Sequence, residues 1–424
     1  MRRLAYLLSL ALVFSVPWEA GIQFHALGTG AKLLGFVASA VWLVSLLGRG
    51  RVRAFDQFHH VYFLFLVWSG LTLFWSIDPK ATSTGFLTYA QIFLMAIMLW
   101  DLFDTRRAID TAVQMYVLGA YITSGSIVLK YLTSPGPKCP VCHSRINALG
   151  FQTDGIALII AIAAPAAWYL AMAPGRSRGS RLLRIVNAAY LPLGLMGIAL
   201  TGTRGATLAS IPTALLIIWS LHHATRRLRA IALVTVAGAV ILLAGYAPSL
   251  QLNRIATATS ATQLGSQGSS LGDRWYIWVA STHVFLGHPF VGVGVDSHRA
   301  AVAPLLEQQT VYKDYLKEAH NTYLSVLVET GMVGFAILLA LILSVVRRVR
   351  ILTGWDRWYW STQLGVLAIG AMSLSLEDSK SIWIFMSLAI ATAATQRTAP
   401  VPERSTTAAP VRHGLALATG PERR

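Results

Sequence analysis

The residues best suited to chemistry stand where short polar segments meet long apolar ones. In "KEAHNTYLSVLVETGMVGF" (residues 317–335), His320 lies at such a junction and Glu329 lies within the apolar part. An imidazole at a membrane surface can carry a proton near neutral pH. The positive end of a helix and nearby arginines disfavour its charged form, and a general base must be neutral. His320 is therefore a candidate general base. An interfacial histidine that bonds a loop carbonyl is the structural alternative.

Three arginines are candidates for binding an anionic group. Arg204 lies in "LTGTRGAT" between two apolar segments, Arg274 begins the aromatic segment "GDRWYIW", and Arg145 follows a loop with two cysteines. Arginine forks match phosphate oxygens, often through two hydrogen bonds. An arginine this close to hydrocarbon should face an interior cavity or an anionic headgroup. The plainer interpretation is that these arginines bind ordinary lipid phosphates or cap helices.

No motif predicts a metal or a cofactor. Glu377-Asp378 is the nearest approach to a paired-carboxylate pattern, and neither a Walker loop nor a G-x-S-x-G motif occurs. We interpret Cys139 and Cys142 in "KCPVC" as a structural loop or a disulfide. A metal site would need about four ligands, and a redox motif would need a βαβ context. We therefore expect no metal ligands and no cofactor.

The composition predicts an all-α integral membrane protein. Of the 424 residues, 55% are hydrophobic and 12% are charged, whereas a soluble domain would carry roughly twice that charged fraction. The apolar blocks that are long enough to cross a bilayer number about twelve. The expected spans are about 4–18, 29–48, 57–75, 81–100, 108–132, 148–172, 182–200, 206–221, 228–247, 319–346, 358–375 and 381–395.

The net charge of +17 comes mainly from arginine clusters in every second gap between the apolar blocks. This alternation follows the positive-inside rule, so it predicts that both termini and the arginine-rich gaps face the cytoplasm. Nucleic-acid binding requires one basic face, and the clusters are distributed among separate gaps. We therefore expect membrane lipids, and no nucleic acid, among the partners.

The pattern of blocks and gaps divides the chain into four parts. In order, they are a transmembrane bundle of about nine spans (1–247), a large external loop (248–318), three further spans (319–395) and a disordered cytoplasmic tail (396–424). Within the loop, residues 272–290 are expected to form an amphipathic helix at the membrane interface. Residues 299–317 are expected to form a second short helix, so the loop should be partly ordered.

Four short motifs carry a family resemblance. They are "TGTRGA" around Arg204, "GDRWYIW" followed by "GHPFVGVGVDSH", "AHNTYLSVLVETGMVG" from Ala319, and "SRINALGF" around Arg145. Together they resemble the O-antigen ligase family, within the membrane enzymes that use polyprenyl-diphosphate-linked glycans. The third motif fits the family pattern H-N-x-x-L…E-x-G-x-x-G, and the resemblance is strongest over residues 200–335.

The resemblance implies a fold and an activity. The fold is that of a membrane-embedded glycosyltransferase. The implied activity moves O-antigen from undecaprenyl diphosphate onto the lipid A–core oligosaccharide, at the periplasmic leaflet of the bacterial inner membrane. The family is similar to metal-independent, inverting transferases. The implied roles are His320 as the catalytic base, Arg204, Arg274 and Arg145 as ligands of the diphosphate, and Asn321, Tyr323 and Glu329 as supporting residues.

Other functions fit parts of the same pattern. An O-antigen polymerase would use the same donor with a lipid-linked acceptor, and a protein O-glycosylating ligase shares the histidine motif. A transporter or flippase of lipid-linked glycans would also need external arginines, but it would need no base. Substitution of His320 should therefore separate the enzymes from the transporter.

Overall fold

The computed structural model describes residues 1–24, 28–134, 145–172, 181–246, 270–308 and 318–397. Within these ranges it is helical apart from a short antiparallel ribbon, in which β1 (Gln23–Phe24) pairs with β2 (Gly28–Thr29). The α-helices are α1 (Arg2–Ser15), α2 (Gly30–Leu47), α3 (Gln57–Leu71), α4 (Pro79–Leu102), α5 (Arg106–Thr133), α6 (Thr153–Met172), α7 (Arg181–Thr201), α8 (Arg204–Ala209), α9 (Ile211–Ser220), α10 (Arg226–Tyr246), α12 (Ser270–Gly287), α13 (His298–Glu307), α14 (Thr322–Arg350), α15 (Gly354–Ala371) and α16 (Lys380–Arg397).

The described helices confirm the predicted class, an all-α protein that crosses the membrane several times. Eight segments of the described chain are long and apolar enough to span a bilayer. They are Arg2–Gly21, Gly30–Leu47, Pro79–Leu102, Arg106–Thr133, Thr153–Met172, Arg181–Thr201, Arg204–His223 and Thr322–Arg350. The other four expected spans coincide with α3, α10, α15 and α16, and the exact number of crossings stays a prediction.

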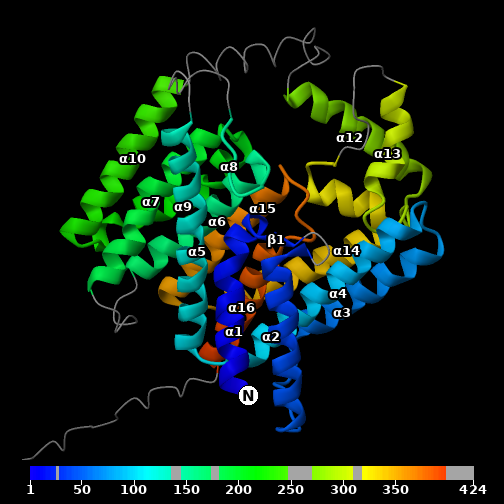
Figure 1. Cartoon of the computed structure of the whole chain (residues 1–424), viewed down its shortest axis with the longest axis horizontal. Helices are drawn as coiled ribbons and strands as arrows, with labels where there is room; N and C mark the ends of the chain where they lie inside the picture. The colour runs from blue at the N-terminus through cyan, green and yellow to red at the C-terminus, as the bar shows by residue number, and fades with distance from the viewer. Residues whose placement is uncertain (25–27, 135–144, 173–180, 247–269, 309–317, 398–424) are drawn as a thin grey trace, which may run out of the picture.

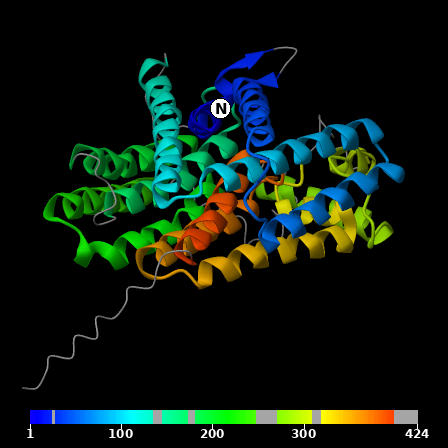
Figure 2. The ribbon, with the colours of Figure 1, turned by 90° about the horizontal axis from the view of Figure 1, so that it is seen from below.

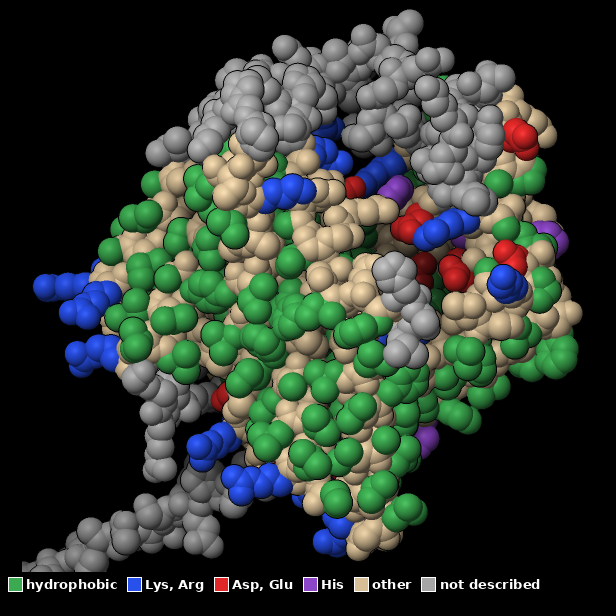
Figure 3. Space-filling view, viewed as in Figure 1, with side chains coloured by type: hydrophobic (Ala, Val, Ile, Leu, Met, Phe, Trp, Pro, Cys, Tyr) green, Lys and Arg blue, Asp and Glu red, His purple; other side chains and the backbone are tan. Residues whose placement is uncertain are grey.

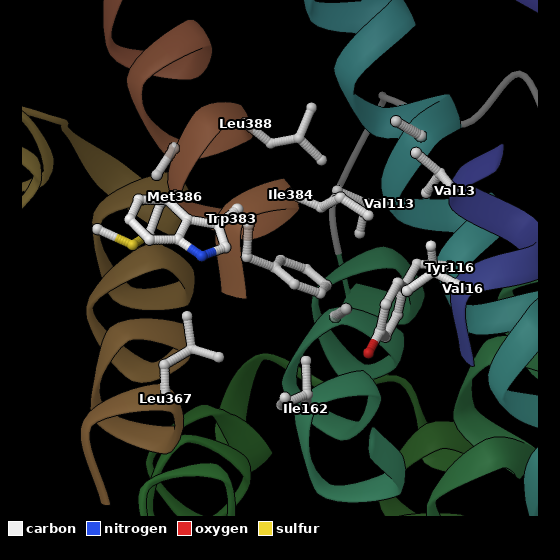
Figure 4. Close-up of a cluster of buried hydrophobic side chains, with 14 of the residues drawn as sticks. Val13, Val16, Val113, Tyr116, Ile162, Leu367, Trp383, Ile384, Met386 and Leu388 are labelled. Carbon is white, nitrogen blue, oxygen red and sulfur yellow. The ribbon is translucent and has the colours of Figure 1, made fainter. Parts of the chain in front are cut away.

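The helices pack around a central core to which α5, α6 and α16 all contribute. Figure 4 shows part of this core, where Ile384 of α16 lies toward Val113 of α5, and Trp383 of α16 lies beside Met386. Lipid is as apolar as these side chains, so helices associate in a membrane by close packing rather than by escape from water. The sequence of α6, "TDGIALIIAIAAPAAWYLAM", supplies the small residues that such packing needs.

The two ends of the molecule differ in what they carry. Figures 1 and 2 show the N terminus and the helical bundle around α1, and in Figure 1 α12 and α13 lie at the opposite end from the N terminus. Figure 3 shows hydrophobic side chains over the middle of this face, lysines and arginines beyond them, and a hollow with acidic side chains near α12 and α13. Short helices were expected at residues 272–290 and 299–317, and α12 and α13 lie at the first range and at the start of the second, while residues 309–317 lie outside the described residues.

Helix α14 is interrupted within the membrane part. Gly331 has φ +66° and ψ −172°, so the helix breaks there. The chain at Phe290 passes so close that a Cβ on Gly331 would lie 2.3 Å from its carbonyl carbon. Gly292 faces the same problem from the other side, with φ +69° and the carbonyl carbon of Glu329 at 2.4 Å. Both positions therefore require glycine, for backbone conformation and for space.

Main-chain hydrogen bonds join the interrupted helix to the loop that crosses it. Val293 N–H donates to the carbonyl of Val328 (3.0 Å), and Gly294 N–H donates to that of Glu329 (2.9 Å). Below the break, Met332 N–H donates to the Pro289 carbonyl (2.8 Å). Irregular backbone is tolerated in a membrane only where protein satisfies its polar groups. The glycine-rich segment after α12, residues 288–294, therefore holds α14 at its interruption through main-chain hydrogen bonds, and we call this segment the clamp.

Candidate functional site

Two of the predicted arginines converge on one carboxylate. Arg274 of α12 donates from Nη2 to Oδ2 of Asp154 (3.2 Å), and Arg145 forms an ion pair with Oδ1 of the same residue. Arg145 also donates from Nη2 to the hydroxyl of Thr203 (3.0 Å) and from Nε to the carbonyl of Thr201 (3.2 Å). Segments far apart in the chain thus meet at the start of α6. Two guanidinium groups share a single carboxylate here, so the three side chains together carry one formal positive charge.

Arg204 begins α8 directly beside this cluster. The preceding residue, Thr203, has its hydroxyl 3.1 Å from Oδ1 of Asp154. Gly202 has φ +61° and turns the chain between α7 and α8, and a Cβ on Gly205 would lie 2.3 Å from the hydroxyl of Ser373. These two glycines let the chain reverse tightly against the segment after α15. The motif "TGTRGA" therefore places Arg204 next in sequence to Thr203, which contacts the carboxylate shared by Arg145 and Arg274.

His320 is held in place by its neighbours on both sides. Asn321 caps α14, since its Oδ1 accepts hydrogen bonds from the N–H groups of Tyr323 (3.1 Å) and Leu324 (3.2 Å). The indole N–H of Trp278 donates to the carbonyl of Ala319 (2.9 Å). His320 itself has φ +49°, a left-handed conformation that a residue other than glycine rarely adopts. Such strain often marks functional positions, because the surrounding structure must maintain it.

Helix α12 connects the arginine cluster to His320. Arg274 and Trp278 are four residues apart, so their side chains lie on the same face of α12, one turn from each other. Arg274 binds Asp154, and Trp278 binds the residue before His320. One helix face therefore positions both a cation for an anionic substrate and the segment that carries the candidate base.

Burial opposes the charge on Arg274 and Asp154 favours it. The half-buried position of Arg274 lowers its pKa, and Arg145 acts in the same direction, while the carboxylate of Asp154 raises it. An arginine nevertheless stays protonated under physiological conditions. A second anion at this site, such as a phosphate, would find guanidinium groups that are already partly removed from water.

The three residues expected to support the base have different surroundings. Asn321 is the helix cap described above. Glu329 is 4% exposed, and its main-chain carbonyl accepts a hydrogen bond from Gly294 N–H (2.9 Å), so it takes part in the contact between α14 and the segment that crosses it. Tyr323 donates its hydroxyl to the carbonyl of Ala368 on α15 (3.2 Å) and lines an apolar cavity of about 140 Å³. Its hydroxyl is thus bound to α15, whereas Arg145 and Arg274 are bound to Asp154.

Sequence reasoning missed three residues of this site, namely Asp154, Thr203 and Trp278. Asp154 lies in the first turn of the apolar helix α6, where the positive N-terminal end of the helix stabilises an acidic side chain. A survey of the acidic residues that border the spans, beside the arginines, would have found it. Trp278 lies in the segment 272–290 that was expected to form an amphipathic helix. Its indole N–H binds the carbonyl of Ala319, whereas Trp275 of the same helix is 52% exposed.

Several expectations lie outside the described residues. They concern Cys139 and Cys142, the segment before α12, and residues 398–424 of the tail. In the part of the chain that the structure describes, no three His, Cys, Asp or Glu side chains are grouped so that they could hold a metal ion.

Comparison with known proteins adds one finding. Residues 189–339 match the family model described as O-antigen ligase. This region contains Arg204, Arg274 and His320 with the clamp between them, while Arg145 and Asp154 precede it. No curated protein matches the chain significantly.

Proposed function

Because residues 189–339 match the O-antigen ligase family model, we propose that this protein transfers O-antigen polysaccharide from undecaprenyl diphosphate to the lipid A–core oligosaccharide. The family consists of ligases that transfer glycosyl groups and serve lipopolysaccharide synthesis. The observation that carries the proposal is the arrangement along α12. Arg274 joins Arg145 at Asp154, and Trp278 holds the segment that ends in His320.

The proposed reaction needs a base and a cationic site for a leaving group. A hydroxyl oxygen of the acceptor sugar attacks the anomeric carbon of the first O-antigen sugar, and the bond from that carbon to the diphosphate oxygen breaks. His320 takes the hydroxyl proton as the new bond forms. Undecaprenyl diphosphate leaves with the electron pair, and attack from the opposite face inverts the anomeric centre.

The arginines have the chemistry to stabilise the leaving group. Arg145 and Arg274 are oriented by Asp154, and Arg204 follows Thr203 in the same cluster. Preorganised cations lower the barrier most where charge develops in the transition state, which here is on the departing diphosphate. They would do so without a divalent metal, so activity of the purified protein should survive excess chelator. Loss of activity that magnesium or manganese restores would contradict this part of the proposal.

We place the protein in the bacterial inner membrane with this site facing the periplasm. The support is the alternation of arginine clusters along the sequence. Single cysteines can test it in a variant without Cys139 and Cys142. A cysteine at Thr282 of α12 should react with an impermeant reagent from the periplasm, and one at Arg181 of α7 only from the cytoplasm. The reverse pattern would place the site on the wrong side for the proposed substrates.

Reconstitution tests the activity itself. Purified protein in proteoliposomes is given undecaprenyl-diphosphate-linked O-antigen and lipid A–core oligosaccharide, and the joined product is measured. A polymerase would instead lengthen the lipid-linked glycan, and a protein O-glycosylating ligase would need a protein acceptor. Glycan joined to lipid A–core, in a reaction with the donor and no protein acceptor, supports the ligase. Longer glycan on undecaprenyl diphosphate overturns it, and so does a reaction that gives product only when a protein acceptor is added.

A further inference from the structure

A second polar site lies beside the residues that immediately precede His320. It is a cavity of about 90 Å³ between α4, the start of α13, the start of α14 and the segment before α16. Figure 3 shows the acidic side chains that gather around a hollow in this part of the molecule. The carboxyl groups that line the cavity belong to Asp296, Glu318, Glu329, Glu377 and Asp378.

Most of these carboxyl groups are already bound within the protein. Oε1 of Glu329 accepts a long hydrogen bond from the hydroxyl of Ser325 (3.5 Å), and Glu318 forms an ion pair with Arg299. Oε1 of Glu377 accepts a hydrogen bond from the hydroxyl of Ser325 (2.7 Å). These groups build the walls, so the cavity is an organised site rather than a loose collection of acids.

Two buried oxygens that line the cavity have no hydrogen-bond partner among the described residues. They are Oε2 of Glu377 and the hydroxyl of Ser375. A buried polar group that lacks a partner destabilises the fold, so native structures rarely leave one without a role. A ligand with hydroxyl groups that enters the cavity would satisfy both.

The protonation of the cavity also favours a neutral polar ligand. Burial, with Asp378 nearby, raises the pKa of Glu377 to about 8. Burial likewise raises the pKa of Asp296. At neutral pH the Glu377 carboxyl group is therefore mostly protonated and can donate a hydrogen bond, while its neighbours accept. Sugar hydroxyls both donate and accept, whereas a phosphate or carboxylate would meet repulsion here.

The residues just before His320 adjoin two sites of opposite charge. Trp278, which binds the carbonyl of Ala319, lies on the same helix face as Arg274 of the cationic cluster. Glu318 and Ala319 also line the acidic cavity. A transferase that joins an anionic donor to a hydroxyl acceptor needs such a difference, because each substrate must be directed to its own side of the base.

We infer that the acidic cavity binds the terminal sugar of the acceptor, and that Glu377, Asp378 and Ser375 select a neutral or amino sugar over a phosphorylated or acidic one. The inference rests on the proposed function and adds a substrate class to it. The selection has two parts. Hydrogen bonds to Glu377 and Ser375 hold the sugar hydroxyls, and the negative field around Asp378 excludes anions.

The test compares two acceptors in proteoliposomes. One is lipid A–core with a neutral terminal hexose, and the other is the same molecule with a phosphate on that hexose. The wild-type protein should use the phosphorylated acceptor at least about tenfold less efficiently, as kcat/KM. Glu377→Gln and Asp378→Asn should each raise the KM for the neutral acceptor several-fold to about tenfold and leave the KM for the donor unchanged.

Controls separate this inference from the function on which it depends. Glu307→Gln removes an exposed carboxylate at the end of α13, outside the cavity, and should behave as the wild type. Asp378 is exposed, so Asp378→Asn should fold even if Glu377→Gln does not. An unchanged acceptor KM in Asp378→Asn, with equal use of both acceptors, overturns the inference while the ligase activity stands. A higher donor KM also overturns it. No product from the wild type with either acceptor overturns the proposed function instead.

Discussion

Arg274 and Asp154 form an ion pair at 3.2 Å although 120 residues separate them in the chain. Their side chains are 22% and 17% exposed, so each charge is partly removed from water. If Asp154 acts by orienting Arg274, the effects of Asp154→Asn and Arg274→Ala on kcat/KM should not add. The double variant should then lose less activity than the two single losses combined, and any loss beyond that of Arg274→Ala reflects the contact of Asp154 with Arg145. Additive losses would mean that Asp154 acts independently of Arg274.

Loss of either predicted diphosphate ligand should weaken donor binding. We expect Arg204→Ala and Arg274→Ala each to raise the KM for the lipid-linked donor and to lower kcat, because a dispersed charge loses one of few partners. Lysine should restore only part of the activity, since it keeps the charge but not the fork. Arg357→Ala, an exposed arginine at the start of α15, is the matched control. Full activity in both lysine variants would show that charge alone suffices.

Removal of the candidate base should spare binding and slow the chemistry. His320→Ala is expected to lower the rate at saturating donor by roughly 10²–10⁴-fold, the usual range for a lost general base. The deficit should be largest at neutral pH and smaller in alkali, where hydroxide can replace the imidazole. Binding of undecaprenyl diphosphate to the folded variant is the second measurement. If binding collapses while turnover at saturating donor is normal, His320 is a ligand of the diphosphate and the base lies elsewhere.

Trp278 should matter through one hydrogen bond. Trp278→Phe keeps an aromatic ring but removes the N–H that binds the Ala319 carbonyl. One such bond contributes about 0.5–1.5 kcal/mol, so kcat should fall roughly 2- to 10-fold with the donor KM unchanged. Trp275→Phe, on the exposed side of the same helix, should leave kcat intact. Equal effects of the two substitutions would argue against a positioning role for Trp278.

Glu377 should make the protein less stable as pH rises. Its pKa is raised from 4.5 to about 8 by burial, and an ordinary exposed carboxyl in the unfolded chain ionises near 4.5. Between these values the folded state holds a proton that the unfolded state releases, so the free energy of unfolding falls as pH increases. Thermal unfolding in detergent should therefore show a higher Tm at pH 5 than at pH 8. Glu377→Gln should flatten this dependence, and an equally steep curve for that variant would assign it to other groups.

Sequence patterns predicted the parts of this molecule that depend on local order. Apolar blocks predicted where helices lie, and the positions of Arg204, Arg274 and His320 marked the candidate site. Residues that act across long distances in the chain were missed. Asp154 matters because α12 returns to the start of α6, and the interruption of α14 at Gly331 exists because the segment near Phe290 crosses it. A hydropathy pattern describes only neighbouring residues in the chain, so it predicts neither of these long-range contacts.

The interruption at Gly331 also constrains the order in which the chain can mature. The carbonyls of Val328, Glu329 and Thr330 are bound by Val293, Gly294 and the indole of Trp68, three groups that precede α14 in the sequence. Without those donors, the part of α14 that leads to His320 would expose polar backbone to lipid. Newly inserted α14 is therefore complete only after the preceding loop has docked on it. Formation of the candidate site therefore depends on the docking of this loop as well as on the insertion of α14.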